Sequence, residues 1–132
     1  MMKNTEILSA ILSRTILSSA FLTTSAQAQI VSYCTYISRN DIFNTSGQRL
    51  RSVSQIIQQD RANLHKFNRG DANDGYENYF TTYNNRVALA RAIENSNVGR
   101  VNMSRELHNN ILNGNAYVCV DYYGEDSVNI YD

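Results

Sequence analysis

Two cysteines are the residues of this 132-residue chain best placed to form a covalent link. Cys34 and Cys119 are the only cysteines, and each lies in a stretch rich in β-branched and aromatic residues, which is typical of strands. In an oxidising compartment two cysteines favour a single disulfide. The alternatives are a reactive thiol or half of a metal site, although neither cysteine has a second Cys or a His at zinc-ligand spacing. We therefore expect a structural disulfide between Cys34 and Cys119.

One carboxylate lies on the apolar face of a predicted helix. Residues 51–67 carry apolar side chains at the 3.6-residue period of a helix, and Asp60 falls in the middle of that face. A buried carboxylate is costly unless it is paired. We expect a buried ion pair with Arg86, on the apolar side of the next helix, with Arg91 as second choice. The alternatives are a functional carboxylate at the floor of a pocket and a different helix register.

The two histidines offer little for catalysis. His65 and His108 each lie on a predicted helix, without a partner at metal-ligand spacing. His65 falls off the apolar face of its helix, so we expect it on the surface. The chain holds no G-x-S-x-G, phosphate-loop or H-E-x-x-H motif. We therefore expect no enzymatic activity, no cofactor and no metal, with a small cell-envelope hydrolase using Asp60 or His108 as the alternative.

Residues 68–78 form the clearest loop and hold most of the candidate binding residues. The run from Asp71 to Gly75 resembles a calcium loop, but its glycine is fifth and Thr82 is twelfth, whereas an EF-hand needs glycine sixth and glutamate twelfth. A turn built on Asp and Asn side chains is the better interpretation. The aromatic residues that follow recur at helix spacing, either as buried core or as an exposed recognition surface. The predicted binding surface consists of Arg69, Asp71, Asp74, Tyr76, Glu77, Tyr79 and Tyr83.

The first 28 residues have the pattern of an export signal. Lys3 supplies a positive charge, an apolar stretch follows, and residues 26–28 offer an A-x-A cleavage site. Arg14 interrupts the apolar stretch, so an amphipathic helix is the alternative, and the uninterrupted run falls short of the ~18–20 residues of a membrane span. We expect residues 1–28 to be a signal peptide, removed to leave a single domain over residues 29–132 that is periplasmic or secreted.

The charge balance bears on the partner. Twelve basic and twelve acidic residues give a formal net charge of zero, so nothing indicates nucleic acid or an anionic membrane surface. We expect no attachment to the membrane after cleavage of the signal. The expected partner is another protein or a component of the cell envelope.

The order of the predicted elements indicates an α+β domain. Strands are expected over residues 30–37, 116–123 and 127–131, with a turn at 124–126. Helices are expected over residues 51–67 and 103–113, the latter ending at Asn113-Gly114, and the helical spacing that follows the loop continues as a helix over residues 85–95. A disulfide between the first two strands would place the two ends of the domain in one sheet. We expect about three helices packed on one face of a small, mostly antiparallel three-stranded sheet.

Two stretches resemble segments of small exported bacterial proteins whose function is not established. They are residues 44–50 (NTSGQRL) and 59–67 (QDRANLHKF), and the likeness extends to Asn85-Arg86 and to the helix-Gly-strand ending around Gly114. The resemblance implies a periplasmic protein and assigns no functional residue. The resulting prediction is a cofactor-free binding protein outside the cytoplasm. A toxin-neutralising protein of the immunity type is a further alternative.

Overall fold

The computed structural model describes residues 19–22, 27–96, 103–124 and 127–132. Most of the predicted signal peptide lies outside these ranges, as do residues 125 and 126 of the predicted turn. The signal peptide over residues 1–28 therefore stays a prediction. None of the helices in the described ranges combines the length and the apolar character that crossing a membrane requires.

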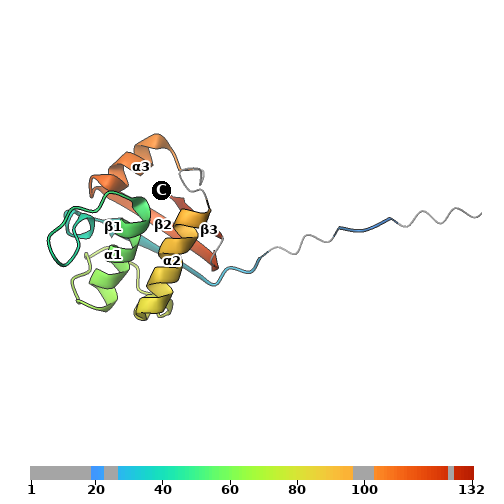
Figure 1. Ribbon diagram of the computed structural model, residues 1–132, viewed down its shortest axis with the longest axis horizontal. Helices are drawn as coiled ribbons and strands as arrows, with labels where there is room; N and C mark the ends of the chain where they lie inside the picture. Colours follow the sequence, from blue (N-terminus) through green and yellow to red (C-terminus); the bar gives the residue numbers. More distant parts are fainter. Residues whose placement is uncertain (1–18, 23–26, 97–102, 125–126) are drawn as a thin grey trace, which may run out of the picture.

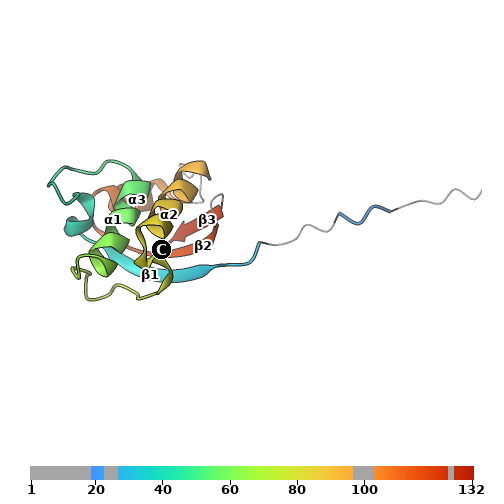
Figure 2. The same ribbon diagram turned by 60° about the horizontal axis from the view of Figure 1, so that its bottom comes forward.

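Within the described residues, helices and strands form two layers. All three α-helices cover the same face of the sheet (Figures 1 and 2), which confirms the predicted α+β fold. In chain order the elements are β1 (Val31–Ile37), η1 (Arg39–Ile42), α1 (Val53–His65), η2 (Tyr79–Thr81), α2 (Tyr83–Asn95), α3 (Arg105–Leu112), β2 (Ala116–Gly124) and β3 (Ser127–Tyr131); η1 and η2 are 3₁₀ helices.

The sheet is antiparallel, with strand order β1-β2-β3. Side chains alternate between its two faces along β1. Tyr33, Thr35 and Ile37 are buried under the helices, whereas the intervening Cys34 and Tyr36 point to the opposite face. The core fills the space between sheet and helices. Its fully enclosed aliphatic members are Ile37, Ile56, Ile57, Leu89, Ile111, Val118 and Val120.

Side-chain caps fix where the three helices begin. The hydroxyls of Ser52, Thr82 and Ser104 each accept a hydrogen bond from a backbone N–H in the first turn of α1, α2 and α3. The cap at Thr82 begins α2 at Tyr83, within the stretch whose aromatic residues recur at helix spacing. At the other end, α3 gives way to Gly114 with φ of +68°, the left-handed terminator that the sequence indicates.

The predicted disulfide between Cys34 and Cys119 is confirmed. The two residues face each other across β1 and β2 with their Cα atoms 3.9 Å apart, on the sheet face that the helices leave uncovered. The bridge joins positions 85 residues apart, so it removes much of the freedom of the unfolded chain. In the chain-entropy picture such a link stabilises the fold by roughly 4–5 kcal/mol.

Replacing both cysteines by serine is therefore expected to lower the free energy of unfolding by about 4–5 kcal/mol. Urea unfolding of the C34S/C119S variant, compared with wild type under non-reducing conditions, measures the difference. Wild type unfolded in the presence of a reductant serves as control and is expected to lose a similar amount. A double variant as stable as the oxidised wild type would contradict the assignment.

Candidate functional site

Asp60 is buried as predicted, but its partner is not Arg86. Its side chain is fully enclosed, and its Oδ2 accepts a hydrogen bond from Arg61 Nε over 2.8 Å. Arg86 instead donates to the backbone carbonyls of Phe80 and Thr81. The predicted Asp60–Arg86 pair is therefore wrong. The buried face of α1 includes Arg61 as well as Asp60, so the guanidinium next to Asp60 also lies in the interior.

The Arg61 guanidinium joins three separate segments of the chain. It is fully enclosed, and its Nη2 donates to Thr35 Oγ1 on β1 over 2.9 Å. Its Nη1 donates to the Gly75 carbonyl over 2.9 Å and to Glu77 Oε1 over 3.2 Å. Because its hydrogen bonds to Asp60, Glu77 and Thr35 are shielded from water, each is stronger than on the surface. One side chain thus ties α1 to β1 and to the loop 68–78.

Thr35 lies between two carboxylates that compete for one hydrogen. Its Oγ1 is 2.9 Å from Oδ1 of Asp60 and 2.9 Å from Oδ1 of Asp74, while it accepts from Arg61. A hydroxyl carries a single hydrogen, so it can donate to only one of the two oxygens. Burial raises the pKa of Asp60 to about 7, even though Arg61 acts in the opposite direction. A protonated Asp60 satisfies all three groups, because it donates to Thr35 and Thr35 donates to Asp74.

The loop 68–78 covers the edge of β1 that β2 leaves open. Gly75 N donates to the Cys34 carbonyl over 2.7 Å, and Tyr36 N donates to Asp74 Oδ1 over 3.1 Å. A Cβ atom at Gly75 would lie 2.5 Å from the Cys34 carbonyl oxygen, so only glycine fits there. Asp74 Oδ2 also accepts from Asp71 N, which confirms the predicted turn. Among the described residues no three His, Cys, Asp or Glu side chains are placed to hold a metal ion.

The structure does not gather the seven predicted binding residues on one surface. Asp74 and Glu77 point inward to the hydrogen bonds just described, and Tyr79 is half-buried with its ring 5.1 Å from that of Phe80. Tyr76 and Tyr83 are exposed. The remaining two are Asp71, which is half-buried in the turn, and Arg69, which is exposed.

The aromatic stripe divides because α2 begins only at Tyr83. Tyr79–Thr81 forms the separate helix η2, so the residues do not share one helical face. Phe80 lies in the core, whereas Tyr76 and Tyr83 are exposed. Of the two interpretations of the stripe, buried core therefore holds for Phe80, and exposure holds for Tyr76 and Tyr83.

His65 is not the surface residue that its helix position predicts. Its side chain is only 2 % exposed, and its Nε2 lies 2.5 Å from Glu77 Oε1. The loop 68–78 folds over it, and the centroid of the Tyr76 ring lies 5.4 Å from that of the His65 ring. The helical pattern of residues 51–67 cannot predict that a later loop covers this side chain. His108 is half-buried on α3. Neither His108 nor the enclosed Asp60 lines the hollows described below.

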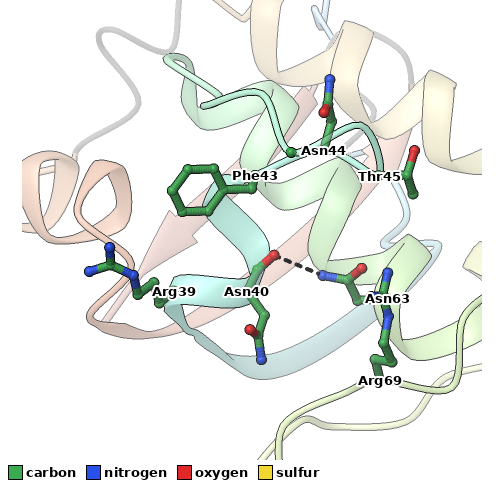
Figure 3. A pocket seen from close by; sticks show the side chains of 8 residues that line it. Arg39, Asn40, Phe43, Asn44, Thr45, Asn63 and Arg69 are labelled. Atoms are coloured by element: carbon green, nitrogen blue, oxygen red, sulfur yellow. Dashed lines mark hydrogen bonds between the residues drawn. The ribbon is translucent and has the colours of Figure 1, made fainter.

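A polar hollow of about 370 Å³ opens beside the C-terminal end of α1 (Figure 3). Two exposed arginines lie on opposite sides of it in this view. Polar side chains from η1, from the following turn and from α1 line the hollow between them. We call it the arginine hollow. It is lined by Arg39, Asn40, Phe43, Asn44, Thr45, Gly47, Asn63 and Arg69.

A second buried carboxylate fixes the floor of the arginine hollow. Asp41 Oδ2 accepts from Ser38 N and so closes the capping box of η1, while Oδ1 accepts from Asn63 Nδ2 over 2.8 Å. Asn63 Nδ2 also approaches the Asn40 carbonyl (dashed line in Figure 3). Burial raises the pKa of Asp41 to about 6. These bonds hold η1 against α1 and leave the Asn40 side chain exposed.

The rim of the arginine hollow is a turn held by its own side chains. Asn44 Oδ1 accepts from the backbone N–H groups of Ser46 and Gln48, and Asn44 Nδ2 donates to the Gln48 side chain. Phe43 pairs with Arg49 in an isolated antiparallel bridge, and the Arg49 guanidinium lies 5.6 Å from the Phe43 ring. The rim is therefore held in shape without a ligand.

The arginine hollow has the chemistry of an anion-binding site. Arg39 and Arg69 are cations, and no carboxylate is among the described residues that line the space. Guanidinium groups bind carboxylates and phosphates through paired N–H donors, and amide side chains add both donors and acceptors. Only Arg69 was in the predicted set, because η1, the turn and α1 are separate in sequence and only their packing brings them together.

Comparison of the chain with protein-family models, with curated proteins and with solved structures finds no match.

The raised pKa values predict that stability falls as the pH rises. Asp60 and Asp41 bind protons more tightly in the folded protein than in the unfolded chain, whose carboxyls titrate near pH 3.8. Their contribution to stability is present in full below that pH and is lost as the pH rises through about 6 and 7. We expect the free energy of unfolding to be lower at about pH 8 than at about pH 5.

An Asp60→Asn variant is expected to show a smaller fall, because its amide stays neutral and can still donate to Thr35. Urea titrations across this pH range measure both slopes. Replacing the exposed Asp132 by Asn provides the control, which should keep the wild-type slope. Parallel curves for wild type and Asp60→Asn would exclude Asp60 as the titrating group.

Proposed function

We propose that this protein is an exported, cofactor-free binding protein that recognises an anionic polar ligand at the arginine hollow. One observation carries the proposal: Arg39 and Arg69 line a common space of about 370 Å³ whose described lining holds amides and an aromatic ring but no carboxylate. A volume of this size suits a small ligand. Exposed guanidinium groups select for carboxylate or phosphate groups on that ligand.

Export to the periplasm or beyond the cell is supported by two independent features. The Cys34–Cys119 disulfide persists only where the surroundings are oxidising, which is usual outside the cytoplasm and rare within it. The charged start, apolar stretch and A-x-A motif of residues 1–28 provide the matching signal. Both favour export, and the A-x-A motif implies a mature chain that starts at Gln29.

Binding is better supported than hydrolysis. The Asp60 carboxylate is enclosed by Arg61 and Thr35, so it offers no free oxygen to a substrate in solution. His108 has no carboxylate hydrogen bond among the described residues and lies outside the arginine hollow. No contact of the described residues favours a toxin-neutralising role over binding of a small anionic ligand.

Export is tested by expressing the full chain in a bacterium and sequencing the N-terminus of the periplasmic product. We expect it to begin at Gln29, with no thiol available for labelling before reduction. Replacing Ala28 by a bulky residue such as phenylalanine is expected to block cleavage, because the site requires small residues. Uncleaved wild-type chain in the cytosol with free thiols would refute the export proposal.

Binding is tested by calorimetry with galacturonate, a sugar with one carboxylate. Removal of a charge-assisted hydrogen bond costs about 1.5–3 kcal/mol, so Arg69→Ala and Arg39→Ala are each expected to raise Kd about 10- to 100-fold. Added salt is expected to weaken binding as well. Arg91→Ala removes an exposed arginine outside the hollow and should bind as wild type does. Equal affinities for all four proteins would overturn the assignment of the site.

A further inference from the structure

A second hollow runs along the outer face of α1. Its volume is about 260 Å³, and its lining combines amides, the cations Lys66 and Arg86 and two aromatic rings. The residues that matter here are Gln55, Gln58, Gln59, Lys66, Phe67 and Tyr83. We call it the glutamine hollow. It contains Tyr83 from the predicted binding set, whose side chain is 66 % exposed and is available to a ligand.

The arginine hollow and the glutamine hollow are neighbours. Thr45 lines both of them. Gln59 of the glutamine hollow donates to Asn63 of the arginine hollow over 2.9 Å. The Phe67 ring of the glutamine hollow lies 5.2 Å from the guanidinium of Arg69 in the arginine hollow. One shared residue and two side-chain contacts therefore place the hollows next to each other beside α1, and we call the pair the track.

The track is too long for a single sugar ring. Gln55 and Asn63 are eight residues apart on α1, and a helix rises 1.5 Å per residue, so this part alone measures about 12 Å. The lining also includes Arg39 on η1 and Arg69, which follows the end of α1 in the chain. An occupant that contacts both hollows is therefore an extended chain of several units.

The side chains along the track match an acidic sugar chain. Amides donate and accept hydrogen bonds as sugar hydroxyls do, and they occur in both hollows. Lys66 Nζ lies 5.2 Å from the Phe67 ring, so a cation and an aromatic ring occur together in the glutamine hollow. Aromatic faces pack against the apolar side of a ring, while Arg39, Lys66 and Arg69 pair with carboxylates. The described lining of either hollow holds no carboxylate that would repel such a ligand.

We propose that the arginine and glutamine hollows together bind one acidic oligosaccharide. This inference rests on the proposed binding function and specifies its ligand. Arg39 and Arg69 pair with carboxylates in the arginine hollow, and Tyr83 contacts a sugar ring in the glutamine hollow. A nucleic acid is a poorer match, because the chain has no net positive charge.

The proposal is tested by calorimetry on the purified protein with tetragalacturonate and galacturonate. We expect the tetramer to bind at least about tenfold more tightly than the monomer, because only the tetramer reaches the glutamine hollow. Tyr83→Ala is expected to weaken binding of the tetramer more than that of the monomer. Tyr117→Ala removes an exposed tyrosine on β2 outside both hollows and is the matched control, with wild-type affinity for both probes.

Several outcomes would overturn this inference. Equal affinity for monomer and tetramer, or an unchanged tetramer affinity in Tyr83→Ala, would confine the ligand to the arginine hollow and leave the proposed function intact. Equal binding of neutral maltotetraose would exclude recognition of the carboxylates. Equal or tighter binding of tetraglutamate would assign the track to acidic peptides instead. If neither galacturonate nor tetragalacturonate binds, the proposed function fails together with this inference.

Discussion

The buried Arg61 guanidinium is the interaction on which the rest of this structure depends. It holds α1, β1 and the loop 68–78 together through Asp60, Thr35 and Glu77. Removing one partner from such a group leaves uncompensated buried charges, which costs several kcal/mol. Glu77 extends the effect, because its second oxygen accepts from Phe80 N where η2 begins. The buried ion pair of Arg61 and Glu77 therefore also holds η2, the 3₁₀ helix that precedes α2.

The same helix also positions the candidate site. α1 carries Arg61 on its inner side and Asn63 at the floor of the arginine hollow, where Asp41 fixes its amide. Arg69 is the second residue of the loop 68–78 that Arg61 holds, and its backbone N–H donates to the Asn63 carbonyl over 2.7 Å. The buried Arg61 ion pairs and the exposed Arg69 are therefore connected through α1 and the loop 68–78. A ligand site on such a support is already formed before a ligand arrives.

Local patterns account for much of the fold but not for the site. The strands around Cys34 and Cys119, their disulfide, the buried Asp60 and the terminator at Gly114 all follow from residue type and spacing. Arg61 could not be placed inward, because only partners distant in sequence make its burial tolerable. The arginine hollow escaped prediction for a related reason. Its two arginines lie 30 positions apart and share no periodic pattern.

The central claim is that buried charges hold the loop 68–78 against β1 as firmly as a neighbouring strand would. Native-state hydrogen exchange at the amides of Tyr36 and Gly75 tests it most directly, because these amides donate to Asp74 and Cys34 across that edge. The account predicts protection comparable to that of amides in the β1–β2 ladder. Exchange of both amides at the rate of an exposed loop would contradict it.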